Sequence, residues 1–238
     1  MDEFWDNKLP PSYYDENLLN GLNKNKGIQA NWHNLTFEKI MMEMPKVGNH
    51  LDYACGPGSF IGNYLNLNSI GVDISKNQIS FANSKYQDKG TFYEKRDFDF
   101  LDYKEYFDVI TVIGLLEYLN EEEALELIEN LYTTLKNNGK ILFTTPNYGS
   151  LMKYLEKIMH HLGPIDYSSQ NKSKYTYKKI NAVFKKNNKG VVSVYKFLNL
   201  GIIFSLLSIN TGKRVVNFID KLFFNKKGFL FLIKIEKI

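Results

Sequence analysis

A glycine turn between a buried strand and a helix is the part of this chain best suited to hold a ligand. The run His50–Tyr53 leads into Gly56 and Gly58, and a helix is expected to begin at Ser59. Glycine lets the backbone approach a ligand closely, and a helix start directs free N–H groups at it. Asp73 ends the next expected strand, where a carboxylate can accept both hydroxyls of a ribose. These residues predict a site for a nucleoside-containing cofactor.

The elements that must position this turn fit one large α/β domain or a domain with a cap. The chain has 238 residues, 44% of them hydrophobic and 15% aromatic, which is enough for a sizeable core and argues against disorder. The single Cys55 excludes an internal disulfide, and no signal-peptide pattern opens the sequence. We therefore expect a cytoplasmic protein. No metal site is assigned from the sequence.

Strands and helices alternate five times along the first two thirds of the chain. Strands are predicted at 49–54, 69–73, 91–95, 107–113 and 140–145. Helices are predicted at 35–43, 59–66, 75–86 and 121–135, the third opened by a capping box at 75–78 and the fourth capped by Asn120. This alternation predicts a doubly wound, Rossmann-like parallel sheet. A ligand then belongs at the carboxyl ends of the strands, beside strand one.

The two ends of the chain complete this core. Residues 1–33 are predicted to form an N-terminal cap in which Pro10, Pro11 and Gly21 prevent a long helix. Beyond the core at 34–147, the C-terminal part at 148–238 is expected to add helices near 150–161 and 177–186 and strands near 191–198 and 229–235. The prediction is a seven-stranded sheet whose last pair forms an antiparallel edge. Residues 199–227 are an insertion between the last two strands.

Two nucleoside cofactors compete for this layout. A nicotinamide cofactor favours G-x-G-x-x-G, but Ile61 stands at the third glycine position and Gly62 comes one residue late. Two Tyr-x-x-x-Lys pairs are present, yet the number of Tyr and Lys residues predicts about that many by chance. The nicotinamide interpretation is therefore weak.

The alternative is S-adenosylmethionine, since five segments resemble the motifs of class I S-adenosylmethionine-dependent methyltransferases in order and spacing. The segment 51–58 resembles L-D-x-G-C-G-x-G and 71–75 the second motif, while 96–98 stands where the family has a G-D-A-like segment. The segments 107–110 and 115–119 resemble F-D-x-I and L-E-H-I, and 135–147 resembles L-K-P-G-G-x-L followed by T-T-P-N. The resemblance covers residues 47–147.

Three residues depart from the family pattern. Ala54 replaces the first glycine, so a conventional backbone angle is expected there. Tyr118 replaces the histidine after Glu117, and the role of that histidine cannot be transferred. Asn138 replaces a loop glycine, which Asn can do because it tolerates left-handed φ.

The resemblance implies a role for each cofactor-site residue. The backbone of 54–58, with Ala54, Gly56 and Gly58, would lie under the methionine part, and Asp52 would face its ammonium group. Asp73 would bind the ribose, with Ile74 beside it. The remaining assignments are Asp97 and Phe98 to the adenine and Ile113 and Gly114 to the methionine tail. Cys55 is then a motif residue and not a nucleophile.

A base is needed only if the acceptor must lose a proton. The candidates are His33 in the cap and the pair His160 and His161. Tyr13 and Tyr14 are candidate lid aromatics.

The acceptor is expected to be a small molecule that is lipid-linked, quinone-like or a saccharide. Residues 1–150 hold 13 Lys and Arg against 22 Asp and Glu, whereas residues 151–238 hold 17 against 4. This basic part, with apolar runs at 197–209 and 215–224, suggests peripheral contact with an anionic membrane, although Lys-rich coding bias could also explain it. The alternatives are a non-catalytic cofactor-binding scaffold or an RNA methyltransferase. No RNA-binding module is visible in the sequence, which makes nucleic acid a poor partner.

Overall fold

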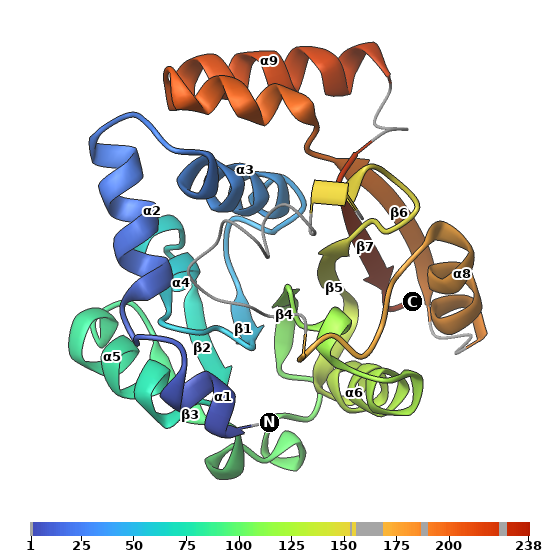
Figure 1. The fold of residues 1–238 in the computed structure, drawn as a ribbon. Helices are drawn as coiled ribbons and strands as arrows, with labels where there is room; N and C mark the ends of the chain where they lie inside the picture. Colours follow the sequence, from blue (N-terminus) through green and yellow to red (C-terminus); the bar gives the residue numbers. More distant parts are fainter. Residues whose placement is uncertain (1, 153, 156–168, 187–189, 224–227) are drawn as a thin grey trace.

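A seven-stranded sheet forms the centre of the computed structural model, which describes residues 2–152, 154–155, 169–186, 190–223 and 228–238 (Figure 1). The strand order is β3-β2-β1-β4-β5-β7-β6. The strands are β1 (Asn49–Tyr53), β2 (Asn68–Asp73), β3 (Thr91–Glu94), β4 (Phe107–Ile113), β5 (Leu135–Pro146), β6 (Val191–Phe197) and β7 (Leu230–Glu236). Neighbouring strands from β1 to β5 pair in parallel, and β7 runs antiparallel to both β5 and β6. The predicted fold class, with seven strands and an antiparallel edge, is confirmed.

Helices cover both faces of this sheet, and each face has its own hydrophobic core. The described helices are α1 (Asp2–Asn7), α2 (Tyr13–Asn23), α3 (Ile28–Met41), α4 (Ser59–Tyr64), α5 (Lys76–Tyr86), α6 (Glu121–Thr134), α8 (Tyr177–Lys186) and α9 (Ile209–Leu222), with 3-10 turns η1 (Lys95–Asp97), η2 (Phe100–Tyr103), η3 (Leu116–Tyr118) and η4 (Leu200–Leu206). In β4, Ile110 joins the core under α6 and α8, and Val109 joins the core under α3, α4 and α5. Successive strand side chains point to opposite faces, which is why β4 carries apolar residues on both faces.

The N-terminal segment is more helical than its prolines and glycine predict. Pro10 separates α1 from α2, but Gly21 lies inside α2. A Cβ at Gly21 would come within 2.1 Å of the Cβ of Ala30, so this glycine allows α2 and α3 to pack closely and does not end a helix. The helix expected from residue 35 begins at Ile28, directly after Gly27 with its φ of 132°. Helix α3 therefore runs through the predicted cap boundary at residues 33 and 34.

A buried carboxylate fastens α2 to the sheet core. Asp15 is fully buried and accepts hydrogen bonds from the hydroxyls of Ser59 and Tyr86, both at 2.7 Å. The ammonium group of Lys85 lies 2.5 Å from the other carboxylate oxygen. Buried carboxylates require such partners because they cannot be solvated by water. Helix α2 is thereby held beside the glycine turn.

A second set of polar contacts joins α3 to the C-terminal insertion. The Asn31 amide donates to Ser205 Oγ at 2.7 Å and to the carbonyl of Ile209 at 3.2 Å. Gly212 makes this approach possible, since a Cβ there would come 2.1 Å from Ser205 Oγ. Figure 1 shows α9 lying above α3. Helix α3 from the N-terminal part of the chain and the η4–α9 segment from its C-terminal part therefore pack against each other.

The other differences concern the last third of the core and the insertion. The helix expected to reach Leu135 ends at Thr134, because Leu135 already pairs with Phe107 in the sheet. Asn138 has a φ of 63°, as its tolerance of left-handed angles predicts. Within the insertion, residues 200–222 form η4 and α9. Most of the helix predicted at 150–161 lies outside the described residues.

Candidate active site

A cavity of about 1110 Å³ opens at the carboxyl ends of β1, β2 and β4. Its wall includes Gly56 after β1, Asp73 at the end of β2, and Gly114 after β4. Tyr14 of α2 and Trp32 of α3, both from the N-terminal part of the chain, also line the cavity. This is the location expected for the ligand of a doubly wound sheet.

The turn after β1 provides an open backbone wall. Gly56 and Gly58 have φ values of 53° and 75°, which favour glycine. Apart from Gly56 itself and its two chain neighbours, no heavy atom of the described residues lies within 4 Å of the place where a Cβ of Gly56 would stand, so the missing side chain leaves space on the cavity wall. At Gly58 a Cβ would come 2.7 Å from Cε1 of Phe92, so packing requires glycine there.

The conventional backbone angle expected at Ala54 is wrong. Its φ is 67°, a left-handed conformation that costs a residue with a Cβ about 1–2 kcal/mol. The N–H groups of Ala54 and Cys55 both donate to the carbonyl of Val72, at 2.7 and 3.0 Å, and these bonds hold the turn against β2. Burial raises the pKa of the Cys55 thiol well above its usual range, in agreement with a packing role.

Asp73 links the turns that follow β1 and β2. Its Oδ2 accepts the N–H of Gly56 at 2.8 Å, and its Oδ1 accepts the N–H of Ser75 at 2.9 Å. A carboxylate has about four acceptor positions, so after these bonds and a further backbone contact from Ile74 it retains capacity for a ligand hydroxyl. Burial raises the pKa of Asp73, and the charge of Asp6 adds to this shift. Ile74 lines the cavity next to it.

A buried polar chain ends at Asp52 on the cavity wall. Ser69 Oγ lies 3.1 Å from His50 Nδ1, and His50 Nε2 lies 2.8 Å from Thr111 Oγ1, which donates to Asp52 Oδ1 at 2.7 Å. When Asp52 is ionised, the one hydroxyl proton of Thr111 goes to its carboxylate, so His50 donates from Nε2 to Thr111 and Nδ1 is left as an acceptor. Burial raises the pKa of Asp52 to about 7 and lowers the pKa of His50 to about 3. Asp52 therefore ionises readily when a cation binds beside it.

The segment after β3 does not lie where its predicted role requires. The Asp97 side chain is 60% exposed, and Phe98 is buried with its ring stacked on Tyr103 at 4.9 Å. Among the described residues, the cavity wall takes Lys95 and Phe100 from this segment and neither Asp97 nor Phe98. Their assignment to the adenine stays a prediction that this geometry does not support.

Ile113 and Gly114 lie on the cavity wall at the end of β4. Gly114 has a φ of 66°, so the strand ends in a turn that exposes backbone to the cavity. Contact of these two residues with the methionine tail stays a prediction.

Sequence reasoning does not single out two polar residues of the wall, Gln78 and Glu117. Gln78 is 2% exposed, and within the described part of the chain neither atom of its amide has a hydrogen-bond partner. Ser75 caps α5 by accepting the N–H of Gln78, but the return bond of a capping box is missing. Glu117 is buried and accepts from Thr145 Oγ1 at 3.1 Å. Gln78 lies in the predicted capping box at 75–78, and Glu117 lies in the segment 115–119 that resembles a family motif. Their place in these segments is the sequence signal that could have pointed to the cavity wall.

A buried amide without hydrogen-bond partners lowers the free energy of unfolding unless a ligand provides those partners. Gln78 follows the ribose-binding candidate Asp73 by little more than one helical turn and shares its cavity wall. Both amide atoms are buried beside the cavity, so a turn of the Gln78 side chain would be needed to present them to a polar ligand.

Of the three candidate bases, the structure places His33 on the cavity wall. His160 and His161 lie outside the described residues. The His33 ring packs against Tyr14 at a centroid distance of 5.5 Å, and burial lowers its pKa to about 4. A neutral imidazole therefore faces the cavity near pH 7. Tyr13 and Tyr14 line the cavity as well.

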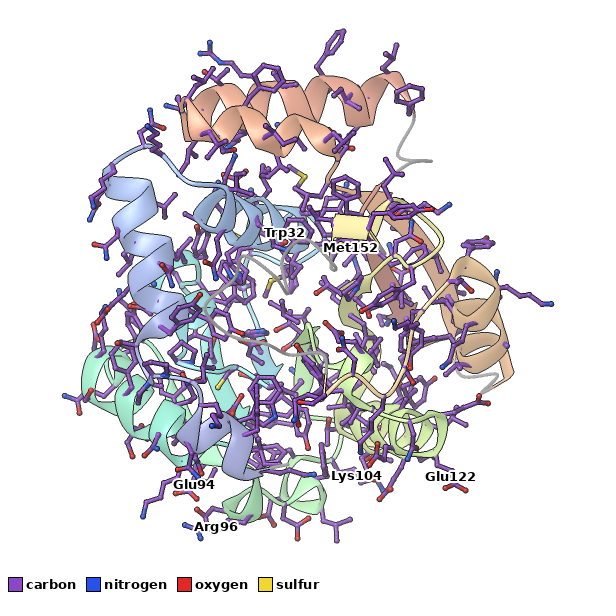
Figure 2. All side chains as sticks on the ribbon, in the orientation of Figure 1. Trp32, Glu94, Arg96, Lys104, Glu122 and Met152 are labelled. Atoms are coloured by element: carbon purple, nitrogen blue, oxygen red, sulfur yellow. The ribbon has the colours of Figure 1, made fainter. Side chains whose placement is uncertain are left out.

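The end of the cavity nearest α9 is apolar. Trp32 and Phe229 stack with their ring centroids 6.4 Å apart. Met152, Leu200 and Ile203 complete this part of the wall. Figure 2 labels Trp32 and Met152 on the side of the molecule toward α9. The cavity thus has a polar end at Asp52, Asp73 and Gln78 and an apolar end.

The sequence matches a family model described as a methyltransferase domain over residues 29–194. This range is well over half of the chain and contains the glycine turn and strands β1 to β5. No curated protein sequence matches the chain.

Solved structures with a similar fold include three methyltransferases. One is a SAM-dependent methyltransferase from Archaeoglobus fulgidus, 20% identical, covering 86% of this chain and 94% of that one with a TM-score of 0.56. Geranyl diphosphate C-methyltransferase from Streptomyces coelicolor is 15% identical, with coverages of 86% and 78% and a TM-score of 0.57. Magnesium protoporphyrin IX methyltransferase from Synechocystis is 14% identical, with coverages of 98% and 100% and a TM-score of 0.59. At these identities the likeness establishes the fold.

Replacement of Ala54 by glycine tests the strained turn. We expect Ala54→Gly to raise the free energy of unfolding by about 1 kcal/mol, because glycine adopts a positive φ without the Cβ contact. The matched control is Ala82→Gly in the interior of α5, where Ala82 is fully buried and the same change should lower stability by about 1 kcal/mol. Chemical denaturation measures the free energy of unfolding of both variants. An Ala54→Gly protein less stable than the wild type would contradict the left-handed φ of Ala54.

Proposed function

Because the chain belongs to the methyltransferase-domain family and has the class I S-adenosylmethionine-dependent fold, we propose that it methylates an apolar small molecule. The observation that carries this proposal is the two-ended cavity, polar at the β1–β2 turns and apolar toward α9. When bound, the cofactor supplies a sulfonium methyl group that the acceptor attacks in line, with S-adenosylhomocysteine as the leaving group.

The polar end suits the cofactor residue by residue. Asp52 provides a carboxylate for the ammonium group, and the bare backbone at Gly56 leaves room for the methionine portion. Asp73 retains acceptor positions for the ribose hydroxyls, and the Gln78 amide can donate to and accept from the same nucleoside. Charge-assisted bonds to the hydroxyls would strengthen this binding.

The apolar end suits the acceptor. Trp32, Phe229, Leu200 and Ile203 offer rings and aliphatic side chains but no charge, so the body of the acceptor would be bound by burial of apolar surface. Two of the similar folds are named for geranyl diphosphate and magnesium protoporphyrin IX, both of which have large apolar parts. These names support an apolar acceptor here without identifying it.

His33 is the candidate for proton handling. It lies in α3, on the helix that also carries Trp32, so it faces the cavity beside the apolar end. A neutral imidazole can accept a proton from a hydroxyl or amine and becomes an imidazolium, while transfer of the methyl group removes the positive charge of the sulfonium. If the acceptor is a carbon nucleophile or an amine already deprotonated, His33 would only shape the cavity.

Titration of S-adenosylmethionine by calorimetry tests the function, with Gln78→Leu as the sharpest variant. We expect wild-type protein to bind and Gln78→Leu to bind at least about tenfold more weakly, because two hydrogen bonds are lost. The same variant should be equally or more stable in denaturation, since it removes an unpartnered buried amide.

The opposite directions of these two effects separate a ligand-binding residue from a structural one. No binding to the wild type at millimolar concentration would contradict the proposed function and favour a scaffold. Unchanged affinity in Gln78→Leu would remove Gln78 from the site while leaving the function intact.

The pKa of Asp52 predicts a pH dependence of cofactor binding. The ammonium group of the cofactor needs the ionised carboxylate of Asp52, whose pKa is about 7 in the free protein. Below that pH, the carboxyl group must therefore lose a proton before it can bind the ammonium group. We expect affinity to fall about tenfold per pH unit below pH 7 and to level off above it. Asp52→Asn should bind weakly at every pH, and a wild type whose affinity is constant from pH 5.5 to pH 7 would contradict this role.

A further inference from the structure

We propose that η4 and α9 form a docking surface for an anionic lipid bilayer, placed so that the acceptor can enter the cavity from the membrane. The part of this inference that concerns the acceptor rests on the proposed function. Binding to the bilayer does not, because it follows from the surface of η4 and α9 alone.

This surface, which we call the η4–α9 face, exposes an unusual amount of apolar side chain. Its large exposed residues are Ile203, Phe204 and Leu206 in η4, Leu207 directly after η4, and Phe218 and Leu222 in α9. Leu207 is 74% exposed and Phe218 is 68% exposed. Exposed apolar side chains gathered on two elements that pack against each other indicate an interaction surface, whereas isolated exposed apolar residues do not.

The two sides of α9 are distinct. Ile209, Gly212 and Val216 are buried and recur along one side, which packs on α3 and η4. Arg214, Phe218 and Lys221 recur at helical spacing on the opposite side and are exposed. Figure 1 shows α9 at the top of the molecule, with its outer side uncovered by the described elements.

The charge of the η4–α9 face is positive, because its one carboxylate points inward. Asp220 is the only acidic residue between positions 199 and 223. It accepts from the Asn199 amide at 2.7 Å and from the Leu198 N–H at 3.4 Å, so it is used in fastening η4 to α9. Arg214 and Lys221 remain exposed among the apolar residues. Cations around an apolar surface are typical of helices that lie in the interface of anionic membranes.

A bilayer fits this surface better than a second copy of the chain does. In a symmetric dimer the same face would meet itself and bring Arg214 and Lys221 against their equivalents without opposing carboxylates. An anionic bilayer accepts both the cations and the apolar side chains. In the part of the chain that the structure describes, no helix is long and apolar enough to span a membrane, so the contact would lie at the surface.

The η4–α9 face is continuous with the apolar end of the cavity. Leu200 and Ile203 are about half exposed, and both also line the cavity. Their neighbour Ile202 is buried and lines it too. An apolar acceptor could therefore pass from lipid to the cavity along side chains of η4 without crossing water.

Vesicle sedimentation tests the proposal with full-length protein and no acceptor. We expect binding to vesicles of phosphatidylcholine mixed with phosphatidylglycerol, weakening as salt is raised, and at least about tenfold weaker binding to phosphatidylcholine alone. The double variant Leu207→Glu/Phe218→Glu should lose at least about tenfold in binding to the mixed vesicles. Arg214→Ser/Lys221→Ser should lose most of the preference for the anionic lipid.

The matched control is Val47→Glu/Leu101→Glu, which adds the same charge at positions 80% and 84% exposed outside the η4–α9 face. Leu101 lies in η2, and Lys104 next to this turn is labelled in Figure 2 at the edge opposite α9. This control should bind vesicles like the wild type, and all variants should keep their affinity for S-adenosylmethionine in solution.

The proposal is overturned if wild-type protein does not bind the anionic vesicles, or if the control loses as much binding as the Leu207→Glu/Phe218→Glu variant. A dimer in solution that this variant converts to monomers, without vesicle binding, would assign the η4–α9 face to a second copy. Cofactor affinity is measured without vesicles, so a failure of the proposed function remains distinguishable.

Discussion

The hydrogen bond from the Gly56 N–H to Asp73 Oδ2 is the interaction on which the site depends. It connects the carboxyl ends of two neighbouring parallel strands, and the two N–H donors of Ala54 and Cys55 to Val72 support the same junction. The acid that is expected to bind the ribose therefore also shapes the turn that is expected to receive the methionine part. Burial raises the pKa of Asp73, and the backbone N–H donors around it act in the opposite direction by stabilising the ionised carboxylate.

The other half of the cavity depends on a contact between the two ends of the chain. Asn31 in α3 and Ser205 in η4 are 174 positions apart, and their 2.7 Å bond brings Trp32 and Leu200 to the same cavity. Cofactor binding and acceptor choice are therefore assigned to different segments. In the proposed function, the sheet motifs would supply the first, and α3 together with the η4–α9 face would supply the second. This arrangement explains why the family motifs do not reveal the acceptor.

The sequence predicts those features that local patterns determine. β4 is rich in β-branched residues, Asn120 and Glu123 form a capping box, and the glycines of the turn fall where positive φ is needed. The length of α3, the angle at Ala54 and the unpartnered amide of Gln78 could not be predicted, because each depends on residues distant in the sequence. Gly21 illustrates the difference, since its place inside α2 is explained by Ala30 of the neighbouring helix. The adenine role of Asp97 and Phe98 follows from the family resemblance and stays a prediction, since the Phe98 ring packs on Tyr103 and neither residue lines the cavity.

The most direct measurement of the central claim is a crystal structure of the protein with S-adenosylhomocysteine. The account predicts that the ribose hydroxyls lie on Asp73, that the Gln78 amide is hydrogen-bonded to the nucleoside, and that the sulfur faces the apolar end at Trp32 and Phe229. A ligand bound with its ribose away from Asp73, or with its sulfur turned from that apolar end, would contradict it.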